Sequence, residues 1–393
     1  KNQEDICHLS RILRGQDRLA IDLEAAGFHR YSDKVCLLQI TAGDKTFLVD
    51  TLLINPSDTL RPFFQNPNIL LILHGGVFDL RLLHRDLQIF PTNLFDTQIA
   101  ASLVGEPSLG LAALLNKYFG IELSKKYQKA DWAKRPLSDD MLAYAASDTQ
   151  TLCSLNELLV EKLRGLGRLS WATEESRALA DLRWTPEPIS DPVLKIKGAK
   201  HLLDREIERL RTACHWRDAI ARKTDRAHFR VAGDPVLLEI AKSESYELDS
   251  MSKIKGMSSK ILKQFGQDLL KNLTRIDNLP ANQLTGYPVN TSPRRPRLSL
   301  NEEKTLDQLK SVRNDMANQL TIARGSIMSN TLLSHIATSH INSSDDLLGI
   351  KGVRKWHVQT FGDDILEVLR NNSSAQICDL SLNLDFSLFL TFA

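Results

Sequence analysis

The stretch that decides the fold is Arg18-Leu-Ala-Ile-Asp-Leu-Glu24, an apolar run of strand length that carries two acids. Asp22 and Glu24 are two residues apart, and residues with that spacing on a strand point to the same face of the sheet. Two ionised carboxylates at the end of a buried strand repel each other and lose hydration, and a divalent cation removes that cost. The spacing therefore indicates a cation site, although Asp-x-Glu is a common tripeptide that also occurs without a metal.

A second acid follows another apolar run. The segment from Ile69 to His74 is continuously apolar, breaks at Gly75 and Gly76, and then has a helical pattern. This order predicts a buried strand, a turn and a helix, with Asp79 in the first turns of the helix beside the end of the strand. Acids at a helix N-terminus also complement the helix dipole, so Asp79 alone leaves both interpretations open.

The third element is Tyr144-Ala-Ala-Ser-Asp148, inside a helix predicted to begin after a capping Ser138 and to run towards Gly165. Residues four apart on a helix share a face, so the Tyr144 phenol and the Asp148 carboxylate can point into one site. An exposed Asp beside a half-buried Tyr is the alternative for this motif alone. Together, the three elements predict a nuclease site with two divalent ions. A ligand set made only of carboxylate oxygens favours Mg²⁺ or Mn²⁺ over Zn²⁺.

Composition places the chain among ordinary globular proteins. It has 393 residues, 42% of them hydrophobic and 25% charged, which is enough for two or three domains. The 5 cysteines have no paired spacing, so neither a disulfide framework nor a zinc cluster is predicted. With no run long enough to cross a membrane, a reducing cytoplasm is the expected location. The sequence begins at Lys1 and not at Met, so the native N-terminus is left open.

The order of predicted elements indicates an α/β domain with a mixed sheet, because strands come first and helices follow. The four expected strands are Leu19 to Glu24, Val35 to Thr41, Lys45 to Asp50 and Ile69 to His74. The catalytic domain is expected to cover residues 1–190, because Pro186, Pro188 and Pro192 mark a boundary.

An internal repeat organises the second half of the chain. Ile254-Lys-Gly-Met257 returns as Ile350-Lys-Gly-Val353, and Gln264-Phe-Gly266 returns as Thr360-Phe-Gly362 in the same register. The repeat predicts two copies of one helical module, with a turn or a helix end at Gly256 and Gly352. The expected limits are residues 191–277 and 299–370 for the modules, 278–298 for a Pro- and Arg-rich linker, and 371–393 for a tail of unassigned role.

Positive charge is concentrated in the first module and the linker. Residues 191–300 contain 21 Lys plus Arg against 13 Asp plus Glu, a balance of +8, whereas the whole chain is +2. Such a surface attracts a phosphate backbone, although a solvated basic face is the alternative. The candidate nucleic-acid contacts are Lys253, Lys255, Lys260, Lys263, Arg294, Arg295 and Arg297.

These motifs resemble the DEDD superfamily of 3′ to 5′ exonucleases, in its tyrosine-containing subgroup, and most closely bacterial ribonuclease D. The resemblance extends to Leu37-Leu-Gln-Ile40, Leu73-His-Gly-Gly-Val-Phe-Asp-Leu80, Phe95-Asp-Thr-Gln-Ile99 and Asp131-Trp-Ala-Lys-Arg-Pro-Leu137. Two departures alter this pattern. Glu24 is followed by Ala25-Ala26-Gly27 and not by an aromatic residue, which changes the wall next to the end of the substrate, and Gly76-Val77-Phe78 precedes Asp79.

The resemblance implies a ribonuclease H-like fold for the first domain, and the two repeated modules resemble HRDC domains. It also implies roles for the residues: Asp22, Glu24 and Asp148 hold one ion, Asp22 shares a second ion with Asp79, and Tyr144 orients the attacking water. The implied activity is trimming of RNA 3′ ends, such as those of tRNA precursors, with release of nucleoside 5′-monophosphates. The alternatives are a DNA exonuclease of the same superfamily and a non-catalytic RNA-binding scaffold. No membrane partner is expected, and protein partners stay open.

Overall fold

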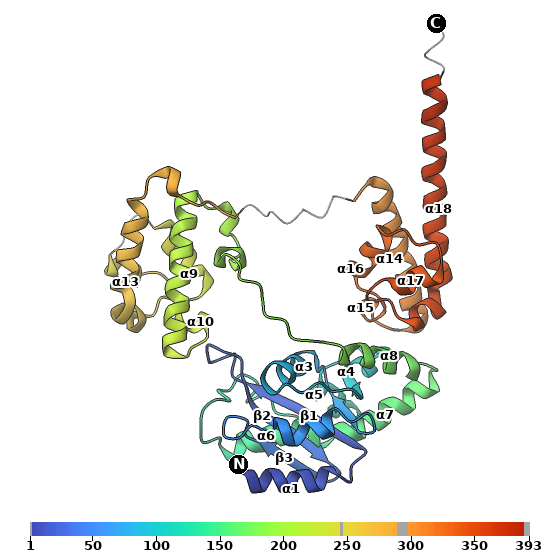
Figure 1. The fold of residues 1–393 in the computed structure, drawn as a ribbon, viewed down its shortest axis with the longest axis horizontal. Helices are drawn as coiled ribbons and strands as arrows, with labels where there is room; N and C mark the ends of the chain where they lie inside the picture. Colours follow the sequence, from blue (N-terminus) through green and yellow to red (C-terminus); the bar gives the residue numbers. More distant parts are fainter. Residues whose placement is uncertain (1, 244–246, 289–297, 389–393) are drawn as a thin grey trace.

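A five-stranded mixed sheet forms the centre of the N-terminal domain in the computed structural model, which describes residues 2–243, 247–288 and 298–388 (Figure 1). The strand order is β3-β2-β1-β4-β5, with antiparallel pairs on the β2 side of β1 and parallel pairs on the β4 side. The predicted mixed sheet is therefore confirmed. The strands are β1 (Arg18–Ala25), β2 (Val35–Ala42), β3 (Lys45–Val49), β4 (Leu70–Leu73) and β5 (Leu94–Asp96).

The sequence prediction missed β5. This strand has only three residues, Leu94–Asp96, so it is too short to show a hydrophobic period. Its pairing with β4 gives it a place in the sheet that the local sequence does not reveal.

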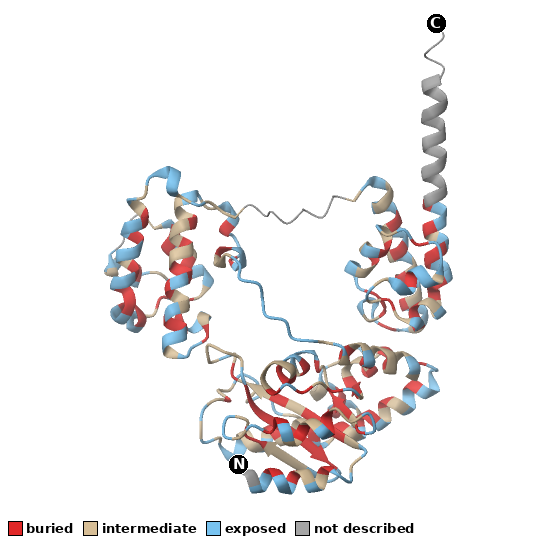
Figure 2. Ribbon diagram, viewed as in Figure 1, coloured by how far each residue is buried: buried red, intermediate tan, exposed pale blue. Residues whose placement is uncertain are grey.

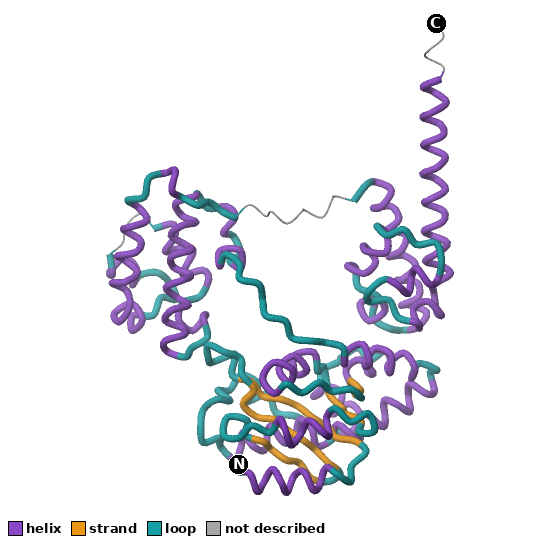
Figure 3. The backbone as a smooth tube through the Cα atoms, viewed as in Figure 1, coloured by secondary structure: helices purple, strands orange, loops and turns teal. Residues whose placement is uncertain are grey.

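The strands carry many buried residues (Figure 2), and helices surround the sheet (Figure 3). Every residue of β2 is buried, whereas β1 is less completely buried at Asp22 and Glu24. The β1–β2 register shifts between Glu24 and Ala25, and such a bulge re-aims the chain that leaves the strand. The helices of this domain are α1 (Gln3–Leu13), α2 (Ser57–Phe64), α3 (Val77–Leu82), η1 (Leu83–Leu87), α4 (Thr97–Val104), α5 (Leu111–Phe119), α6 (Asp139–Gln150), α7 (Leu152–Gly165) and α8 (Leu169–Ala180).

The single helix expected between Ser138 and Gly165 is two helices, α6 and α7, because the backbone turns at Thr151 (φ −102°, ψ 1°). Close to the break, the Thr149 hydroxyl donates to the Ala146 carbonyl at 3.4 Å and accepts a hydrogen bond from Thr41 Oγ1 at 2.8 Å. The break lets α6 pack on β1, β2 and β3 while α7 packs against α4. The predicted Ser138 cap is present and accepts a hydrogen bond from the Met141 amide.

The second half of the chain contains two helical modules, as the repeat predicted (Figure 3). Gly256 and Gly352 occupy equivalent turns and have φ values of +95° and +104°, a region that favours glycine. The first module is built from α9 (Asp204–Thr224), α10 (His228–Val231), α11 (Asp234–Lys242), α12 (Leu248–Ser252) and α13 (Ser259–Asp277). The second is built from α14 (Leu300–Leu320), α15 (Arg324–Ile327), α16 (Asn330–Ala337), α17 (Ser344–Gly349) and α18 (Lys355–Leu388).

The second module shares a hydrophobic core with the catalytic domain. The rings of Trp171 on α8 and Trp356 on α18 stack with centroids 4.6 Å apart, and Glu175 accepts from Trp356 Nε1 at 3.0 Å. Buried Arg168 ties the two parts together by donating to the carbonyls of Leu103 and Leu320, each at 2.9 Å. The second module is thus packed on the N-terminal domain.

Helix α18 continues beyond the expected module limit as far as Leu388, with non-helical dihedral angles at Phe361. The tail that begins at Asn371 is therefore helical over most of its length. Residues 389–393 lie outside the described part of the chain, and so do Arg294, Arg295 and Arg297 of the linker. Among the described helices, none is both long and apolar enough to cross a membrane.

Candidate active site

The two acids of the first motif lie on the central strand of the sheet. Asp22 pairs with Gln39 and Glu24 with Leu37 of β2, so both side chains lie on the same face. Helix α6 packs on β1, β2 and β3, and it covers that face because a carboxylate oxygen of its Asp148 lies within 4.8 Å of oxygens of both acids. The first motif therefore points towards the helix that carries the third.

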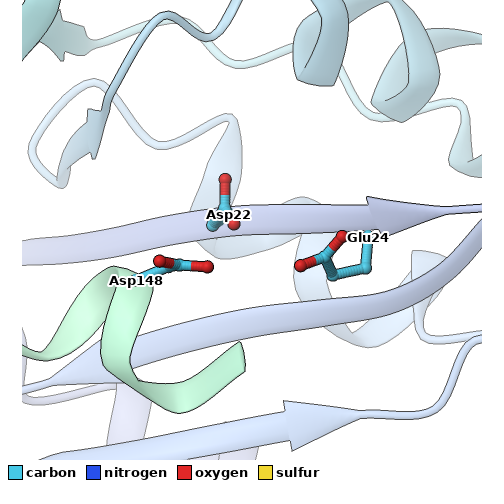
Figure 4. Close-up of side chains that lie close together, drawn as sticks. All are labelled: Asp22, Glu24 and Asp148. Atoms are coloured by element: carbon cyan, nitrogen blue, oxygen red, sulfur yellow. The ribbon is translucent and has the colours of Figure 1, made fainter. Parts of the chain in front are cut away.

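Asp148 completes a group of three carboxylates. One ligand oxygen each from Asp22, Glu24 and Asp148 lies within 4.8 Å of the others, which suits a shared cation (Figure 4). In the close-up, the Asp148 carboxylate on α6 lies across from the strand that carries the other two acids. Residues 126 positions apart in sequence thus converge because α6 packs on β1.

Burial and mutual repulsion make these carboxyl groups harder to ionise than free carboxyl groups. Burial raises the pKa of Asp22 to about 6, and burial with the charge of Asp22 raises the pKa of Asp148 to about 7. Burial, followed by the charges of Asp22, Asp148 and Asp79, raises the pKa of Glu24 to about 9. A site whose acids disfavour ionisation this strongly gains from a cation that binds the ionised form.

Asp79 lies beside this group but is not one of the three that converge within 4.8 Å. It is in the first turn of α3, and burial and then the charge of Asp22 raise its pKa well above the ordinary value. Its position suits a more distant ligand, acting directly or through water.

The turn that presents Asp79 is held by Asp96, a residue to which sequence reasoning assigned no role. The Asp96 carboxylate accepts from the amides of Gly75 at 3.0 Å and Gly76 at 2.8 Å. It also caps α4 through the amide of Gln98 at 2.8 Å. The sequence could have identified Asp96 as a helix cap, because an Asp directly before a helical pattern is typical of an N-cap. Asp96 is therefore a positioning residue.

Tyr144 lies one turn before Asp148 on α6 and packs in a small aromatic group. Its ring centroid is 5.8 Å from that of Tyr127 and 6.1 Å from that of Trp132. Burial, and then the charges of Asp148, Glu24 and Asp22, raise the pKa of Tyr144 above its ordinary value. The phenol therefore keeps its proton at neutral pH and is available as a hydrogen-bond donor.

His74 directly follows β4 near the site. Its Nδ1 lies 2.9 Å from Thr97 Oγ1, and burial lowers its pKa. The ring is therefore neutral and bonded to a neighbouring threonine through Nδ1, while its buried Nε2 has no hydrogen-bond partner among the described residues.

The four candidate lysines of the first module are all exposed. Lys253 and Lys255 lie in the turn around Gly256, and Lys260 and Lys263 lie in the first turns of α13. The four lysines thus belong to the α12–α13 turn and the start of α13, which are remote in sequence from the acids.

The architecture and the acidic group define a class, the metal-dependent 3′ to 5′ exonucleases. The sequence model of the family described as "3'-5' exonuclease" matches residues 1–164, and that of the "HRDC domain" matches residues 206–273 and 302–369. The chain belongs to the ribonuclease D family of that class and carries two HRDC domains.

Individual relatives agree with this placement. A protein named ribonuclease D from Shewanella is 30% identical over 66% of this chain and 67% of its own length. The yeast "Exosome complex exonuclease RRP6" is 30% identical over 90% of this chain, and the match spans 49% of that relative's length. The crystal structure of the catalytic core of RRP6 from Trypanosoma brucei has a TM-score of 0.63 and 30% identity, covering 70% of this chain and 77% of that one.

Proposed function

We propose that this protein is an exoribonuclease that removes nucleotides one at a time from RNA 3′ ends and releases nucleoside 5′-monophosphates. The observation that carries the proposal is the convergence of Asp22, Glu24 and Asp148, with Tyr144 one helical turn away and Asp79 beside them. Each part has a function in hydrolysis of a phosphodiester, which requires a positioned water and stabilisation of negative charge.

The donor set fits magnesium or manganese. All candidate ligands are carboxylate oxygens, and the described residues include no Cys or His in the converging group. We propose that Asp22, Glu24 and Asp148 hold one ion and that Asp22 and Asp79 hold a second. When bound, such ions neutralise charge on the phosphate and lower the pKa of a bound water.

The remaining chemistry belongs to Tyr144 and to the leaving group. The protonated phenol donates a hydrogen bond that orients the attacking water, because its raised pKa makes it unsuitable as a base. Water attacks phosphorus, the bond to the 3′ oxygen of the preceding nucleotide breaks, and that oxygen takes a proton to become the new terminal hydroxyl. The product is a nucleoside 5′-monophosphate.

The direct test uses a 5′-labelled single-stranded RNA and a DNA of the same sequence, incubated with the full chain in Mg²⁺, in Mn²⁺ or in EDTA. We expect a ladder that shortens from the 3′ end on RNA and depends on the metal. Asp148→Asn, prepared in the same way, excludes a contaminating nuclease. Degradation of DNA alone would favour a DNA exonuclease, and RNA binding without cleavage in any metal would favour a non-catalytic scaffold.

We further propose that residues 1–190 form the exonuclease domain, that 191–277 and 299–370 form the two HRDC domains, and that 278–298 link them. The matched family regions and the shared turn at Gly256 and Gly352 support these limits. Structured RNA such as tRNA precursors is the proposed substrate, and the cytoplasm the proposed location. The thiols of Cys7, Cys36, Cys153 and Cys214 are free, which suits a reducing compartment.

The lysines of the first module are expected to bind the RNA backbone. Replacing Lys253, Lys255, Lys260 and Lys263 together by Gln should weaken binding of a long RNA about 10-fold at low salt. The salt dependence should also become shallower, because each lost phosphate contact removes about one released counterion. Fluorescence anisotropy across a salt series measures both quantities. Lys271→Gln, an exposed change later on α13, is the control, and an unchanged salt slope in the fourfold variant would make the cluster a solvated surface.

Metal affinity and metal-free stability are expected to depend on pH in opposite directions. Carboxyl groups with raised pKa stabilise the fold while protonated, and that contribution is lost as pH rises through about 6 for Asp22 and about 7 for Asp148. Bound Mn²⁺ should reverse the loss, so the rise in melting temperature on adding Mn²⁺ should be larger at pH 8 than at pH 5. Thermal unfolding in Mn²⁺ and in EDTA measures this rise at each pH. In the Asp22→Asn, Asp148→Asn double variant, the rise at pH 8 should no longer exceed the rise at pH 5. An equal rise at both pH values would contradict the assignment.

A further inference from the structure

The loop that follows the first motif carries an exposed aromatic ring to the seam with the first HRDC domain. Phe28 is 40% exposed, and Phe229, near the start of α10 in the first HRDC domain, is 53% exposed. Their ring centroids are 5.3 Å apart at an interplanar angle of 56°. Two exposed phenyl rings from different domains thus form one surface, which we call the Phe28–Phe229 platform.

Cations surround the platform. The Arg230 guanidinium lies 5.1 Å from the Phe28 ring centroid and 5.7 Å from that of Phe229, and Lys129 Nζ lies 5.7 Å from that of Phe28. A polar cavity of about 460 Å³ adjoins it, lined by Arg226 and Arg230 and also by Asp131 and Asp225, whose carboxylates both pair with Arg30. Among the described residues, no carboxylate pairs with Arg226, Arg230 or Lys129, so their charge is available to a ligand.

Specific bonds hold the seam in place. The Arg230 side chain donates to the Phe28 carbonyl at 2.8 Å, and the Ala227 amide donates to the His29 carbonyl at 3.1 Å. Tyr31 packs on the core of the first HRDC domain and donates to Asp218 at 3.0 Å. These bonds fix the loop that carries Phe28 against the first HRDC domain, so the two rings are held together before a ligand binds.

The platform is near the acidic site. Phe28 follows Glu24 by four residues, so the two α-carbons are at most about 14 Å apart. Ala26, between them, packs in the same group as Tyr144 and Trp132. No aromatic residue directly follows the acids, because the next three residues are Ala25, Ala26 and Gly27. The first aromatic residue after Glu24 is Phe28.

We propose that the Phe28–Phe229 platform binds single-stranded RNA a few nucleotides upstream of the cleaved 3′ end. Bases stack on the two rings, and Arg226, Arg230 and Lys129 contact the phosphates, a combination typical of single-strand binding. The proposal rests on the proposed exonuclease function, and it assigns the seam between the domains a part in holding the substrate.

The test measures binding of a 5′-labelled single-stranded 12-nucleotide RNA to the full chain in EDTA, where cleavage does not interfere. Phe229→Ala should weaken binding about 5- to 100-fold, the range for loss of a base–aromatic stack. Phe229→Trp should preserve binding. Phe119→Ala is the matched control, since Phe119 is 37% exposed on α5. A dinucleotide should bind all variants equally, because it does not extend to the platform.

A scan with single abasic nucleotides locates the stacked base. An abasic nucleotide at one internal position should weaken binding of the RNA to the wild-type chain. The same abasic RNA should bind Phe229→Ala no more weakly than the intact RNA does. Unchanged affinity of Phe229→Ala for the 12-nucleotide RNA would overturn the proposal even if cleavage were normal. Conversely, weaker RNA binding by Phe229→Ala in EDTA would support the platform even if no metal restored cleavage. The platform and the exonuclease function can therefore be disproved independently.

Discussion

Replacing Asp22 by Asn is expected to lower the rate of 3′ nucleotide release by about 10³-fold or more, because charge stabilisation by bound metal ions contributes several kcal/mol. Asp22 is the acid whose charge raises the pKa of Glu24, Asp79 and Asp148, so it lies at the centre of the group. The substitution conserves shape and removes only charge. Single-turnover release of a labelled mononucleotide in Mg²⁺ is the measurement.

The Asp22→Asn variant should remain folded. Removing one of several repelling carboxylates lowers the electrostatic cost of the metal-free site, so the melting temperature in EDTA should stay equal or rise. Asp44→Asn is the control, since Asp44 is exposed at the turn between β2 and β3. A variant that binds RNA, melts normally and still cleaves at the wild-type rate would remove Asp22 from the metal site.

Replacing Tyr144 by Phe is expected to slow cleavage about 10- to 100-fold while leaving metal binding unchanged. The phenol donates one hydrogen bond to the attacking water in this proposal, and loss of a positioned donor has an effect of about that size or larger. Burial and the neighbouring carboxylates keep its pKa high, so it acts through its proton at every physiological pH. The single-turnover rate measures the effect.

A purely structural role for Tyr144 gives a different result. The Mn²⁺-dependent rise in melting temperature should be the same in Tyr144→Phe and in the wild type, because the phenol is not a proposed ligand. Tyr127→Phe tests the neighbouring phenol, which donates to Asp140 at 3.2 Å and contacts the Tyr144 ring. An unchanged rate in Tyr144→Phe, or an equal loss in Tyr127→Phe, would exclude the water-orienting role.

Local sequence was sufficient for most of the α/β domain. The strands containing Asp22 and the Ile69 to His74 run are long apolar segments, and burial of such segments leaves little choice of structure. The cap at Ser138 and the turns at Gly256 and Gly352 follow from local backbone chemistry. The short strand β5 and the break at Thr151 could not be predicted in this way, because each depends on a partner distant in sequence.

The candidate site shows the same division. Residue types and spacings singled out Asp22, Glu24, Asp79, Tyr144 and Asp148 from sequence. Only the structure brings Asp148 to the first two acids while leaving Asp79 outside the closest group, because the packing of α6 on the sheet and the place of α3 after β4 set those distances. The role of Asp96 as the clamp on the Gly75–Gly76 turn also depends on that packing.

The sequence by itself determined the sheet-forming strands, the acidic chemistry and the existence of two repeated modules, because these depend on hydrophobic period, charge and local turns. Tertiary structure alone decided that two similar modules have different surroundings. Trp356 of the second stacks on Trp171 of the catalytic domain, while Phe229 of the first meets Phe28 beside the acidic site. The physical reason is that contacts between domains depend on which exposed faces meet, and no local pattern in either module encodes its partner.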